Sequence, residues 1–339
     1  MNTTNKNYCQ EKLIVILGPT ASGKSDLAVQ IAREFNGEII SADSRQVYKG
    51  MDIGSGKITK KEMKGVPHYL LDVASPKKRF TVAQFQKLAF IAIKKIQKKN
   101  KIPILCGGTG LYIQSIVDGL VLPEVPPDAK LRAKLEKLTT EKLFVKLQKL
   151  DLRRAKNIDR HNRRRLIRAL EIVIKTGKPV STNSLLLQRR DGVDFVATLD
   201  NHYKNPSYPP FEKGRHLLQL GIGQPKEKLK KLIKKRLLRR LKQGMVSEVL
   251  KLHKQGISWK RLEEFGLEYR AIAQYLQNKI TKQEMIDKIQ KESEQYAKRQ
   301  ITWFKRDKRI KWFKNYKEAG KLTNQFFKLN KKAAEAALN

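Results

Sequence analysis

The sequence predicts an α/β fold, in which helices flank a parallel sheet and an all-helical domain is inserted into the chain. Short apolar runs rich in β-branched residues recur along the sequence, and helical segments separate them, which is typical of a parallel sheet. The insertion is predicted by a proline-rich break at Pro123, Pro126 and Pro127, after which a long charged stretch carries no strand signal.

The expected strands are short segments that suit a buried parallel sheet. The first, at residues 12–17, contains the run Leu-Ile-Val-Ile-Leu and leads directly into a glycine-rich turn. The second ends at Asp43, and the fourth runs into Gly107-Gly108-Thr109-Gly110. The full set is residues 12–17, 38–42, 68–72, 102–106 and 216–221.

The expected helices show apolar residues at helical spacing. In residues 81–98, Val82, Phe85 and Leu88 share one face, and Thr81 is placed to cap the first turn. Residues 128–176 form a charged helical region that ends at Gly177-Lys178-Pro179. Further helices are expected at residues 26–35, 226–244 and 247–255, then onward to residue 300, with a frayed helix at 324–339.

These elements divide the chain into four parts. Residues 1–121 form the first part of the α/β core, and residues 122–212 form the helical insertion. Residues 213–306 complete the core with mostly helical structure, and residues 307–339 form a C-terminal tail. With 339 residues, the chain is long enough to bury a substantial core.

Composition limits the cellular setting and the chemistry. The sequence contains neither an apolar run of the roughly 18 residues that a membrane span needs nor the apolar centre of a signal peptide near its start. We therefore expect a cytoplasmic protein that does not enter membranes. The two cysteines, Cys9 and Cys106, lie far apart without a CxxC pattern, so reduced thiols are expected rather than a zinc site.

The charge of the chain favours a polyanionic partner. Its 73 Lys and Arg against 32 Asp and Glu give a net charge of +41. Residues 1–120 contribute only +10 and residues 121–339 contribute +31, so the excess lies mostly beyond the first strands and helices. Phosphate contacts release counterions and drive such binding. A lysine-rich composition drift explains part of the excess equally well, but not an arginine run such as 163–165.

A phosphate-binding loop follows the first strand. The sequence G-x4-G-K-[ST] is matched between a predicted strand and a predicted helix, as its mechanism requires, so the core is P-loop NTPase-like. Loop amides and the helix N-terminus provide a positive concavity, Lys24 adds a charge, and the Ser25 hydroxyl can ligate Mg²⁺. The nucleotide- or diphosphate-binding residues are Gly18, Pro19, Thr20, Ala21, Ser22, Gly23, Lys24 and Ser25.

A P-loop alone suggests an ATPase or a kinase, which usually has a second acid at a strand end to hold Mg²⁺. The strand before Gly107 ends in Cys106 and offers none. Asp43 and Asp72 do end strands. Either could hold a metal through water, and Asp43 could instead be a base.

Several motifs along residues 12–306 resemble those of bacterial tRNA dimethylallyltransferases. They are residues 43–54 (Asp-Ser-Arg-Gln-Val-Tyr-Lys-Gly-Met-Asp-Ile-Gly), 65–68 (Gly-Val-Pro-His), 107–112 (Gly-Gly-Thr-Gly-Leu-Tyr), 164–171 (Arg-Arg-Leu-Ile-Arg-Ala-Leu-Glu), 177–179 (Gly-Lys-Pro) and 297–304 (Ala-Lys-Arg-Gln-Ile-Thr-Trp-Phe). The resemblance implies transfer of the dimethylallyl group of dimethylallyl diphosphate to N6 of adenosine 37, just 3′ of the anticodon. It also implies Mg²⁺, the anticodon stem-loop of tRNA as partner, and a monomer.

The resemblance also implies roles for individual residues. Asp43 would be the base, Arg236 would contact the diphosphate, and Thr109 would hydrogen-bond near the target adenine. The helical insertion would bind tRNA. The residues expected to contact tRNA are Asp43, Ser44, Arg45, Gln46, Thr109, Arg132, Arg164, Arg165, Leu166, Ile167, Arg168, Lys298, Arg299, Gln300 and Trp303.

The sequence departs from the family pattern in places. Ser55-Gly56-Lys57-Ile58 replaces the usual Thr-Ala-Lys-Pro, Arg163 stands where proline is common, and residues 194–214 are longer than usual. Residues 261–270 match weakly, and no C-terminal zinc finger is present.

Three other interpretations stay open from the residues themselves. A P-loop nucleotide or RNA kinase would turn over ATP, but it lacks an acid at Cys106 and clear lid arginines near the loop. A non-catalytic basic RNA-binding protein would not need intact Lys24, Ser25 and Asp43. A related prenyltransferase acting on free adenylate would not need the strongly basic second half.

Overall fold

The computed structural model describes residues 12–120, 125–179, 186–189, 194–196 and 217–335, with side chains in the last helix described through Lys328. The chain divides into two compact units. One consists of residues 1–117 and 211–339, and the other of residues 118–210. Most of the long segment 194–214 lies outside the described residues.

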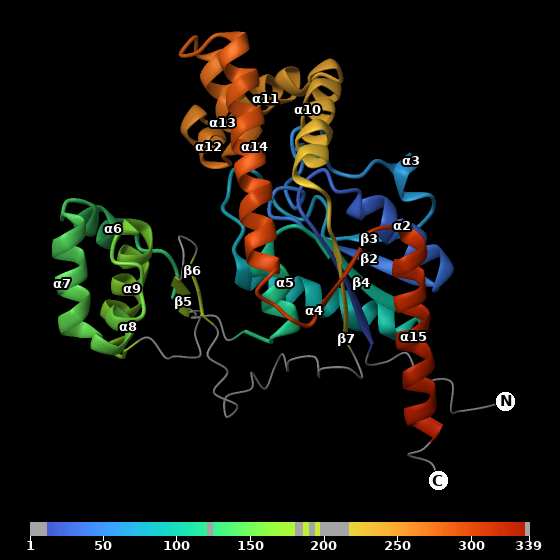
Figure 1. The fold of residues 1–339 in the computed structure, drawn as a ribbon. Coiled ribbons are helices and arrows are strands. Elements are labelled where there is room, and N and C mark those ends of the chain that lie inside the picture. The colour runs from blue at the N-terminus through green and yellow to red at the C-terminus, as the bar shows by residue number, and fades with distance from the viewer. Residues whose placement is uncertain (1–11, 121–124, 180–185, 190–193, 197–216, 336–339) are drawn as a thin grey trace. The chain divides into compact units, whose positions relative to one another are not determined.

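The first unit is built around a parallel sheet (Figure 1). Among the described residues its strand order is β3-β2-β4-β1-β7-β8, and each pair of neighbours is parallel. Every residue of the two central strands β1 and β4 is buried, because helices cover both faces of such a sheet. The strands are β1 (Leu13–Leu17), β2 (Gly37–Ala42), β3 (His68–Tyr69), β4 (Ile102–Gly107), β7 (Leu217–Ile222) and β8 (Ile310–Phe313).

The register of the strands brings three loops to one edge of the sheet. Leu17, the last residue of β1, pairs with Gly107 of β4 and Gly221 of β7, and Ala42 of β2 also pairs with Gly107. The segments that follow β1, β2 and β4 therefore leave the sheet side by side. Ligands of open α/β sheets bind at this carboxyl edge.

Two strands differ from the sequence-based prediction. The third was expected to reach residue 72 but ends at Tyr69, because Leu70 and Asp72 adopt left-handed backbone angles, with φ of 64° and 57°. Strand β8 was missed. It is a four-residue edge strand with only its end residues buried, so it carries no continuous apolar signal.

The C-terminal segment is part of the core rather than a tail. Strand β8 pairs with β7, and helix α15 (Tyr316–Glu335) places Ala319 and Phe326 in the same hydrophobic cluster as Ile14 and Ile104. The expectation that residues 307–339 form a separate tail is thereby corrected. The physical reason is that the apolar side chains of α15, spaced among lysines, complete the cover over the sheet.

Four helices follow the early strands of the first unit. They are α2 (Lys24–Glu34), α3 (Lys60–Met63), α4 (Val82–Lys98) and α5 (Gly110–Val117). Thr81 caps α4 as predicted, since its side chain accepts from Gln84 N while the Gln84 side chain accepts from Thr81 N.

The second part of the unit is mostly helical, as expected. Its helices are α10 (Lys226–Lys242), α11 (Met245–Lys254), α12 (Trp259–Glu264), α13 (Leu267–Leu276) and α14 (Lys282–Phe304). The long helix α14 packs against α10, α13 and α5, and so runs from the helical region to the sheet (Figure 1). No helix within the described parts of the chain is both long enough and apolar enough to cross a membrane.

The second unit is helical through Thr176. Its helices α6 (Ala129–Glu136), α7 (Thr140–Leu150), α8 (Leu152–Lys156) and α9 (Arg163–Thr176) enclose their own core, which includes Leu143, Leu147 and Leu166. Gly177 ends α9 in the left-handed conformation, as predicted. Beyond it, β5 (Leu186–Arg189) and β6 (Asp194–Val196) pair antiparallel. The expected all-helical insertion is thus helical up to Thr176 and then adds a short β-ribbon.

Candidate active site

The phosphate-binding loop lies between β1 and α2, as the sequence predicts. Ala21 and Gly23 adopt positive φ angles of 62° and 87°, which turn the chain tightly before α2 begins at Lys24. The Lys24 ammonium donates to Pro19 O at 3.3 Å, and burial lowers its pKa. The buried Ser22 hydroxyl has no hydrogen-bond partner in the described structure. An unpaired buried hydroxyl and a desolvated ammonium both favour the entry of an anion.

Gln300 of α14 fixes the loop from the opposite side. Its Oε1 accepts from Thr20 N at 2.8 Å, and its Nε2 donates to Gly108 O at 2.8 Å. The side chain is buried and joins the loops that follow β1 and β4. We expected Gln300 to contact tRNA. Its amide is already occupied by two main-chain groups, so its role in the structure is to hold the site together.

Asp43 directly follows β2, and one of its carboxylate oxygens accepts hydrogen bonds from main-chain amides. Its Oδ1 accepts from Arg45 N at 2.8 Å and from Gln46 N at 3.4 Å, which orients the carboxylate. No described residue hydrogen-bonds Oδ2. Thr109, after β4, accepts from Ser44 N at 3.1 Å, so the two loops are joined beside Asp43. An oriented carboxylate with one open oxygen can accept a proton.

Two arginines of α10, Arg236 and Arg240, lie near Asp43 and Thr20 of the phosphate-binding loop. Arg236 donates through Nη2 to the Thr20 hydroxyl, and burial together with the charge of Arg240 lowers the pKa of Arg236 to about 9. Arg240 is buried and donates through Nη1 to Gly54 O at 3.3 Å and to Glu268 Oε1 at 3.4 Å. Glu268 forms an ion pair with Arg240, whereas Arg236 has no carboxylate partner among the described residues, so its charge is available to an anionic ligand.

Two cavities share Arg236 and Arg240 as wall residues. The smaller, of about 260 Å³, is also lined by Asp43, Tyr296 and Glu268. The larger, of about 800 Å³, is lined by residues 21–26, which span the phosphate-binding loop and the start of α2, and by basic residues of α10. The carboxylate and the anion-binding loop therefore face neighbouring spaces that meet at the two arginines.

Sequence reasoning missed Arg240 and Tyr296, and it included Glu268 only in residues 265–270, a segment that the family resemblance implies touches tRNA. Arg240 could have been found, because it lies one helical turn beyond Arg236 and so on the same face. Tyr296 gave no separate signal, because it lies just outside the motif of residues 297–304. Burial and the nearby Asp43 carboxylate raise the pKa of Tyr296 to about 12, so its hydroxyl stays protonated beside Thr109.

Of the first-unit residues that were expected to contact tRNA, some are engaged in contacts within the protein and others line the cavity or are exposed. The Arg45 Nε donates to Phe265 O at 2.7 Å, and the Gln46 amide is occupied by Ser41 and Gly56. Ser44 and Arg299 line the smaller cavity, and Lys298 is exposed on α14. Trp303 packs on Gly110, where an added Cβ would come within 2.1 Å of its Nε1.

In the second unit, a buried carboxylate organises the expected tRNA-binding arginines. Glu171 is fully buried and accepts from Arg132 at 2.7 and 2.8 Å and from Arg168 at 2.5 Å. Arg168 also donates to Val125 O at 2.9 Å. Arg164 is exposed and Arg165 is half-buried.

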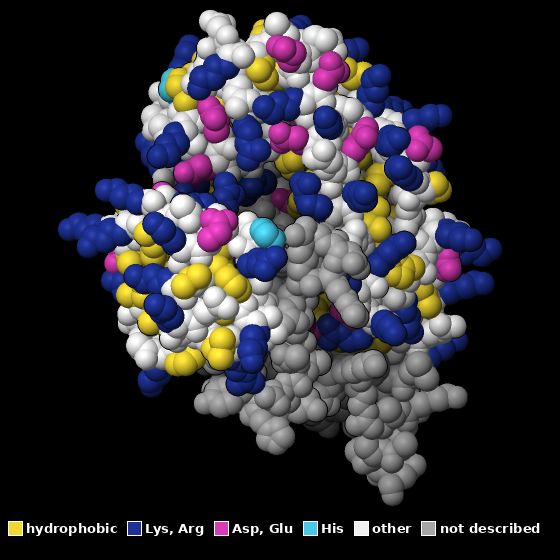
Figure 2. Space-filling view, turned by 60° about the vertical axis from the view of Figure 1, so that its left-hand side comes forward, with side chains coloured by type: hydrophobic (Ala, Val, Ile, Leu, Met, Phe, Trp, Pro, Cys, Tyr) yellow, Lys and Arg dark blue, Asp and Glu magenta, His cyan; other side chains and the backbone are white. Residues whose placement is uncertain are grey.

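The viewed face of the molecule shows many more Lys and Arg side chains than Asp and Glu (Figure 2).

Leu166 and Ile167 require a correction. Both were expected to contact tRNA, but they are 0% and 7% exposed and belong to the core of the second unit. They lie on the face of α9 that packs inward, while Arg164 lies on the exposed face. Their side chains stabilise the unit and leave RNA contact to the cationic residues around them.

The fold and the site together define an α/β protein with a P-loop motif, in which a carboxylate and two arginines lie beside the loop. The chain belongs to the IPP transferase family, whose model matches residues 46–307. The matched range begins just after Asp43 and ends just beyond helix α14.

Individual relatives cover nearly the whole chain. It is 42% identical over 320 residues to a tRNA dimethylallyltransferase of Thermoanaerobacter sp. (strain X514), covering 91% of this chain and 95% of the relative. Its structure is similar to that of a tRNA isopentenylpyrophosphate transferase from Bacillus halodurans, with 33% identity, 96% and 99% of the chains covered and a TM-score of 0.67. It is also similar to a eukaryotic dimethylallyltransferase acting on tRNA, with 27% identity, 87% and 70% covered and a TM-score of 0.69.

Proposed function

We propose that this protein transfers the dimethylallyl group of dimethylallyl diphosphate to N6 of adenosine 37 in tRNA, giving N6-(dimethylallyl)adenosine and diphosphate. The observation that carries the proposal is that Asp43 and Arg236 line one cavity, while Arg236 also reaches Thr20 of the phosphate-binding loop. A proton acceptor and a diphosphate-binding group thus face the same space, as this transfer requires. Relatives named tRNA dimethylallyltransferase support the choice of substrates.

The leaving group would occupy the phosphate-binding loop. As the C–O bond to the diphosphate breaks, negative charge grows on the diphosphate oxygens. Lys24, the loop amides, Arg236 and Arg240 supply positive charge around that position. The desolvation of these cations strengthens their attraction for the anion, because the local dielectric constant is low.

Mg²⁺ fits the donors at this loop. The protein offers hydroxyl oxygens at Ser25 and Ser22, and Mg²⁺ commonly takes only one or two protein ligands together with substrate phosphates and water. Within the described residues no group of three or more His, Cys, Asp and Glu forms an all-protein metal cage. Ser25 would hold the ion, whose charge would help neutralise the diphosphate.

The acceptor amine would lie at the Asp43 end of the cavity. The exocyclic amine of adenine is a weak nucleophile, because its lone pair is delocalised into the ring. As the new N6–C bond forms, the open Oδ2 of Asp43 would take the N6 proton, and Thr109 beside it would hydrogen-bond the base. The bond formed, the bond broken and the transferred proton balance without any other reactant.

The macromolecular partner is proposed to be the anticodon stem-loop of tRNA. The net charge of +31 over residues 121–339 and exposed cations such as Arg164 and Lys298 support binding of phosphates. An adenine in a loop leaves its stack at lower cost than one in a duplex. We further propose that the protein is cytoplasmic and that it is a monomer, because the carboxylate, the arginines and the phosphate-binding loop all come from one chain.

Transfer of label from radiolabelled dimethylallyl diphosphate to an unmodified anticodon stem-loop tests the proposal. The stem-loop should carry adenines at positions 36–38, and the Asp43→Ala variant should be compared with wild type. We expect transfer by wild type and a loss of about a hundredfold or more in the variant, equivalent to about 2.7 kcal/mol of barrier. No transfer to any tRNA substrate, together with Lys24-dependent ATP hydrolysis, would replace this proposal with a kinase or ATPase.

A further inference from the structure

Residues 51–57 form an irregular loop that contributes to the walls of both cavities. Gly54 and Ser55 line the smaller cavity with Asp43, and Gly56 lines the larger one with the phosphate-binding loop. Two of its seven residues are glycines, which impose little conformational restraint of their own. Hydrogen bonds within the loop shape the turn, among them Gly56 N to Ile53 O at 3.1 Å and Lys57 N to Asp52 O at 2.9 Å, and groups of neighbouring elements attach it to the rest of the unit.

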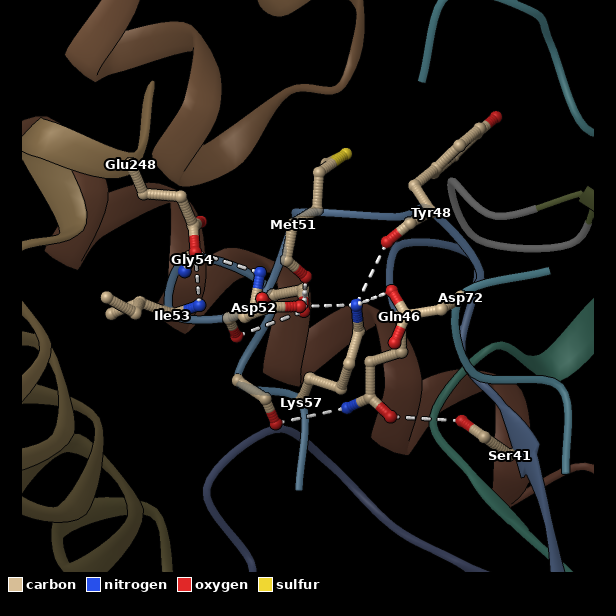
Figure 3. Close-up of polar contacts among 12 residues, drawn as sticks. Ser41, Gln46, Tyr48, Met51, Asp52, Ile53, Gly54, Lys57, Asp72 and Glu248 are labelled. Carbon is tan, nitrogen blue, oxygen red and sulfur yellow. Dashed lines mark hydrogen bonds and ion pairs between the residues drawn. The ribbon is translucent and has the colours of Figure 1, made fainter. Parts of the chain in front are cut away.

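Glu248 of α11 holds the first half of this loop through its main-chain amides (Figure 3). Its Oε2 accepts from Asp52 N at 2.9 Å and from Ile53 N at 2.6 Å, and its Oε1 accepts from Gly54 N at 3.0 Å. The Tyr269 hydroxyl donates to the same Oε1 at 2.9 Å. Four donors thus meet one carboxylate, and bonds to a charged acceptor are stronger than neutral ones.

Lys57 holds the other half of the loop. Its side chain is 6% exposed, and its Nζ donates to Asp52 Oδ1 at 2.5 Å, to Asp72 Oδ1 at 2.6 Å and to Tyr48 O at 2.9 Å (Figure 3). A negative group and a positive group therefore fix the loop at its two ends. The segment between them, around Gly54, Ser55 and Gly56, is the part that faces the cavities.

The fixed loop in turn positions Arg240. The Gly54 carbonyl accepts from Arg240 Nη1 at 3.3 Å. At Gly56 the guanidinium lies directly on the backbone, since an added Cβ there would stand 1.4 Å from Arg240 Nη2. A displacement of the loop by even a few tenths of an ångström would therefore shift the guanidinium that borders both cavities.

We propose that Glu248 is a positioning residue of the reaction, which acts through residues 52–56 on Arg240 and thereby on the binding of diphosphate. The inference rests on the proposed function for its substrate. Glu248 itself lines neither cavity, so it makes its contribution through the loop. Without its carboxylate, the amides of Asp52, Ile53 and Gly54 lose their acceptor and the loop loses its fixed position.

The test is calorimetric binding of inorganic diphosphate to the full chain. The proteins are wild type, Glu248→Gln, Arg240→Lys and the double variant, with KM for dimethylallyl diphosphate measured alongside. We expect Glu248→Gln to weaken binding about tenfold, equivalent to about 1.4 kcal/mol, and to raise KM in proportion. Because Glu248 is proposed to act through the Arg240 guanidinium, which Arg240→Lys removes, the double variant should bind diphosphate nearly as tightly as Arg240→Lys alone does.

Glu227→Gln is the matched control, because this α10 carboxylate is 74% exposed and its one ion pair among the described residues is with Lys230. It should bind diphosphate as wild type does. If Glu248→Gln does not fold, Glu248→Asp keeps both oxygens on a shorter side chain and carries the same expectation. Unchanged affinity in the Glu248 variant, or fully additive losses in the double variant, would overturn the inference. Failure of wild type to prenylate RNA while it binds diphosphate would count against the proposed function alone.

Discussion

The Arg236 guanidinium donates a hydrogen bond to the hydroxyl of Thr20, although the two residues lie 216 positions apart in the chain. Helix α10 thus reaches into the phosphate-binding loop that follows β1. Since β7 lies beside β1 in the sheet and leads into α10, the parallel pairing of these strands brings the arginine to the loop. The proposed diphosphate site is therefore assembled from both halves of a core that the insertion interrupts.

Replacement of Arg236 should weaken binding of the prenyl diphosphate. In Arg236→Ala the site loses a partly buried charge next to Thr20, and hydrogen bonds to charged groups contribute about 1.5–3 kcal/mol. We expect KM for dimethylallyl diphosphate to rise by roughly tenfold to a hundredfold. Lys234→Ala, on the exposed face of the same helix, is the control and should leave KM unchanged. Equal KM values in both variants would contradict the role of Arg236.

Removal of the Gln300 amide should destabilise the first unit. In Gln300→Ala, the partly buried Thr20 N–H and the buried Gly108 carbonyl lose their partner, and an unpaired buried group costs about 1–3 kcal/mol. Differential scanning calorimetry should show a lower Tm, by about 2–4 °C for each kcal/mol lost. Gln283→Ala, an exposed glutamine of the same helix that bonds Asp287, should leave Tm unchanged. An unaltered Tm in Gln300→Ala would show that the tether contributes no stability.

A side chain at residue 110 should disturb the contact between α5 and α14. In Gly110→Ala the new Cβ would stand 2.1 Å from Trp303 Nε1, so the indole or the helix must move. Overpacking of this kind costs about 1–3 kcal/mol. Gly320→Ala in α15, where nothing lies within 4 Å of an added Cβ, should leave stability equal or slightly higher. Urea unfolding of the two variants measures the difference, and equal midpoints would contradict the close contact.

The second unit should lose stability in acid through Glu171. Burial alone would raise the pKa of this carboxyl, but hydrogen bonds from Arg132, Asp128 N and Arg168 hold it below the ordinary value of 4.5. A depressed pKa gives stability that is present above the unfolded value and is lost as the pH falls through the folded one. The free energy of unfolding of wild type should therefore fall below about pH 4.5 more steeply than that of Glu171→Gln.

Glu136→Gln, an exposed carboxylate on α6, is the control for this comparison. Its unfolding free energy should follow that of wild type across the same acid range. Parallel pH profiles for wild type and Glu171→Gln would show that the Glu171 cluster does not contribute the expected stability.

The two faces of α9 should separate RNA binding from stability. Arg164→Ala removes an exposed cation, so it should weaken tRNA binding and reduce the slope of log affinity against log salt by about one. Leu166→Ala removes a fully buried side chain and should cost about 2–5 kcal/mol of unfolding free energy. Filter binding at several salt concentrations and urea unfolding measure the two effects. A salt slope unchanged by Arg164→Ala would remove this residue from the RNA contact surface.

The sequence by itself determined the local features of this protein. The β-branched run of β1, the phosphate-binding loop and the Thr81 cap were all predictable, because each depends on neighbouring residues and their backbone preferences. The helical character of residues 128–176 and its end at Gly177 followed in the same way. The strand end indicated Asp43 as a candidate, the motif resemblance added Thr109 and Arg236, and the structure brings these residues together at one edge of the sheet.

Only the tertiary structure decided which polar groups meet. From the sequence, the Gln300 amide looks like a surface group of a helix, yet it is buried between two loops. Leu166 and Ile167 lie on the buried face of α9, although this helix was expected to bind RNA because of its arginines. Nothing in the sequence around Glu248 indicates a partner, and in the structure its carboxylate accepts hydrogen bonds from three main-chain amides of a loop about 195 residues away in the chain. The physical reason is that these interactions join residues up to 280 positions apart, and packing of the sheet and its helices sets their distances.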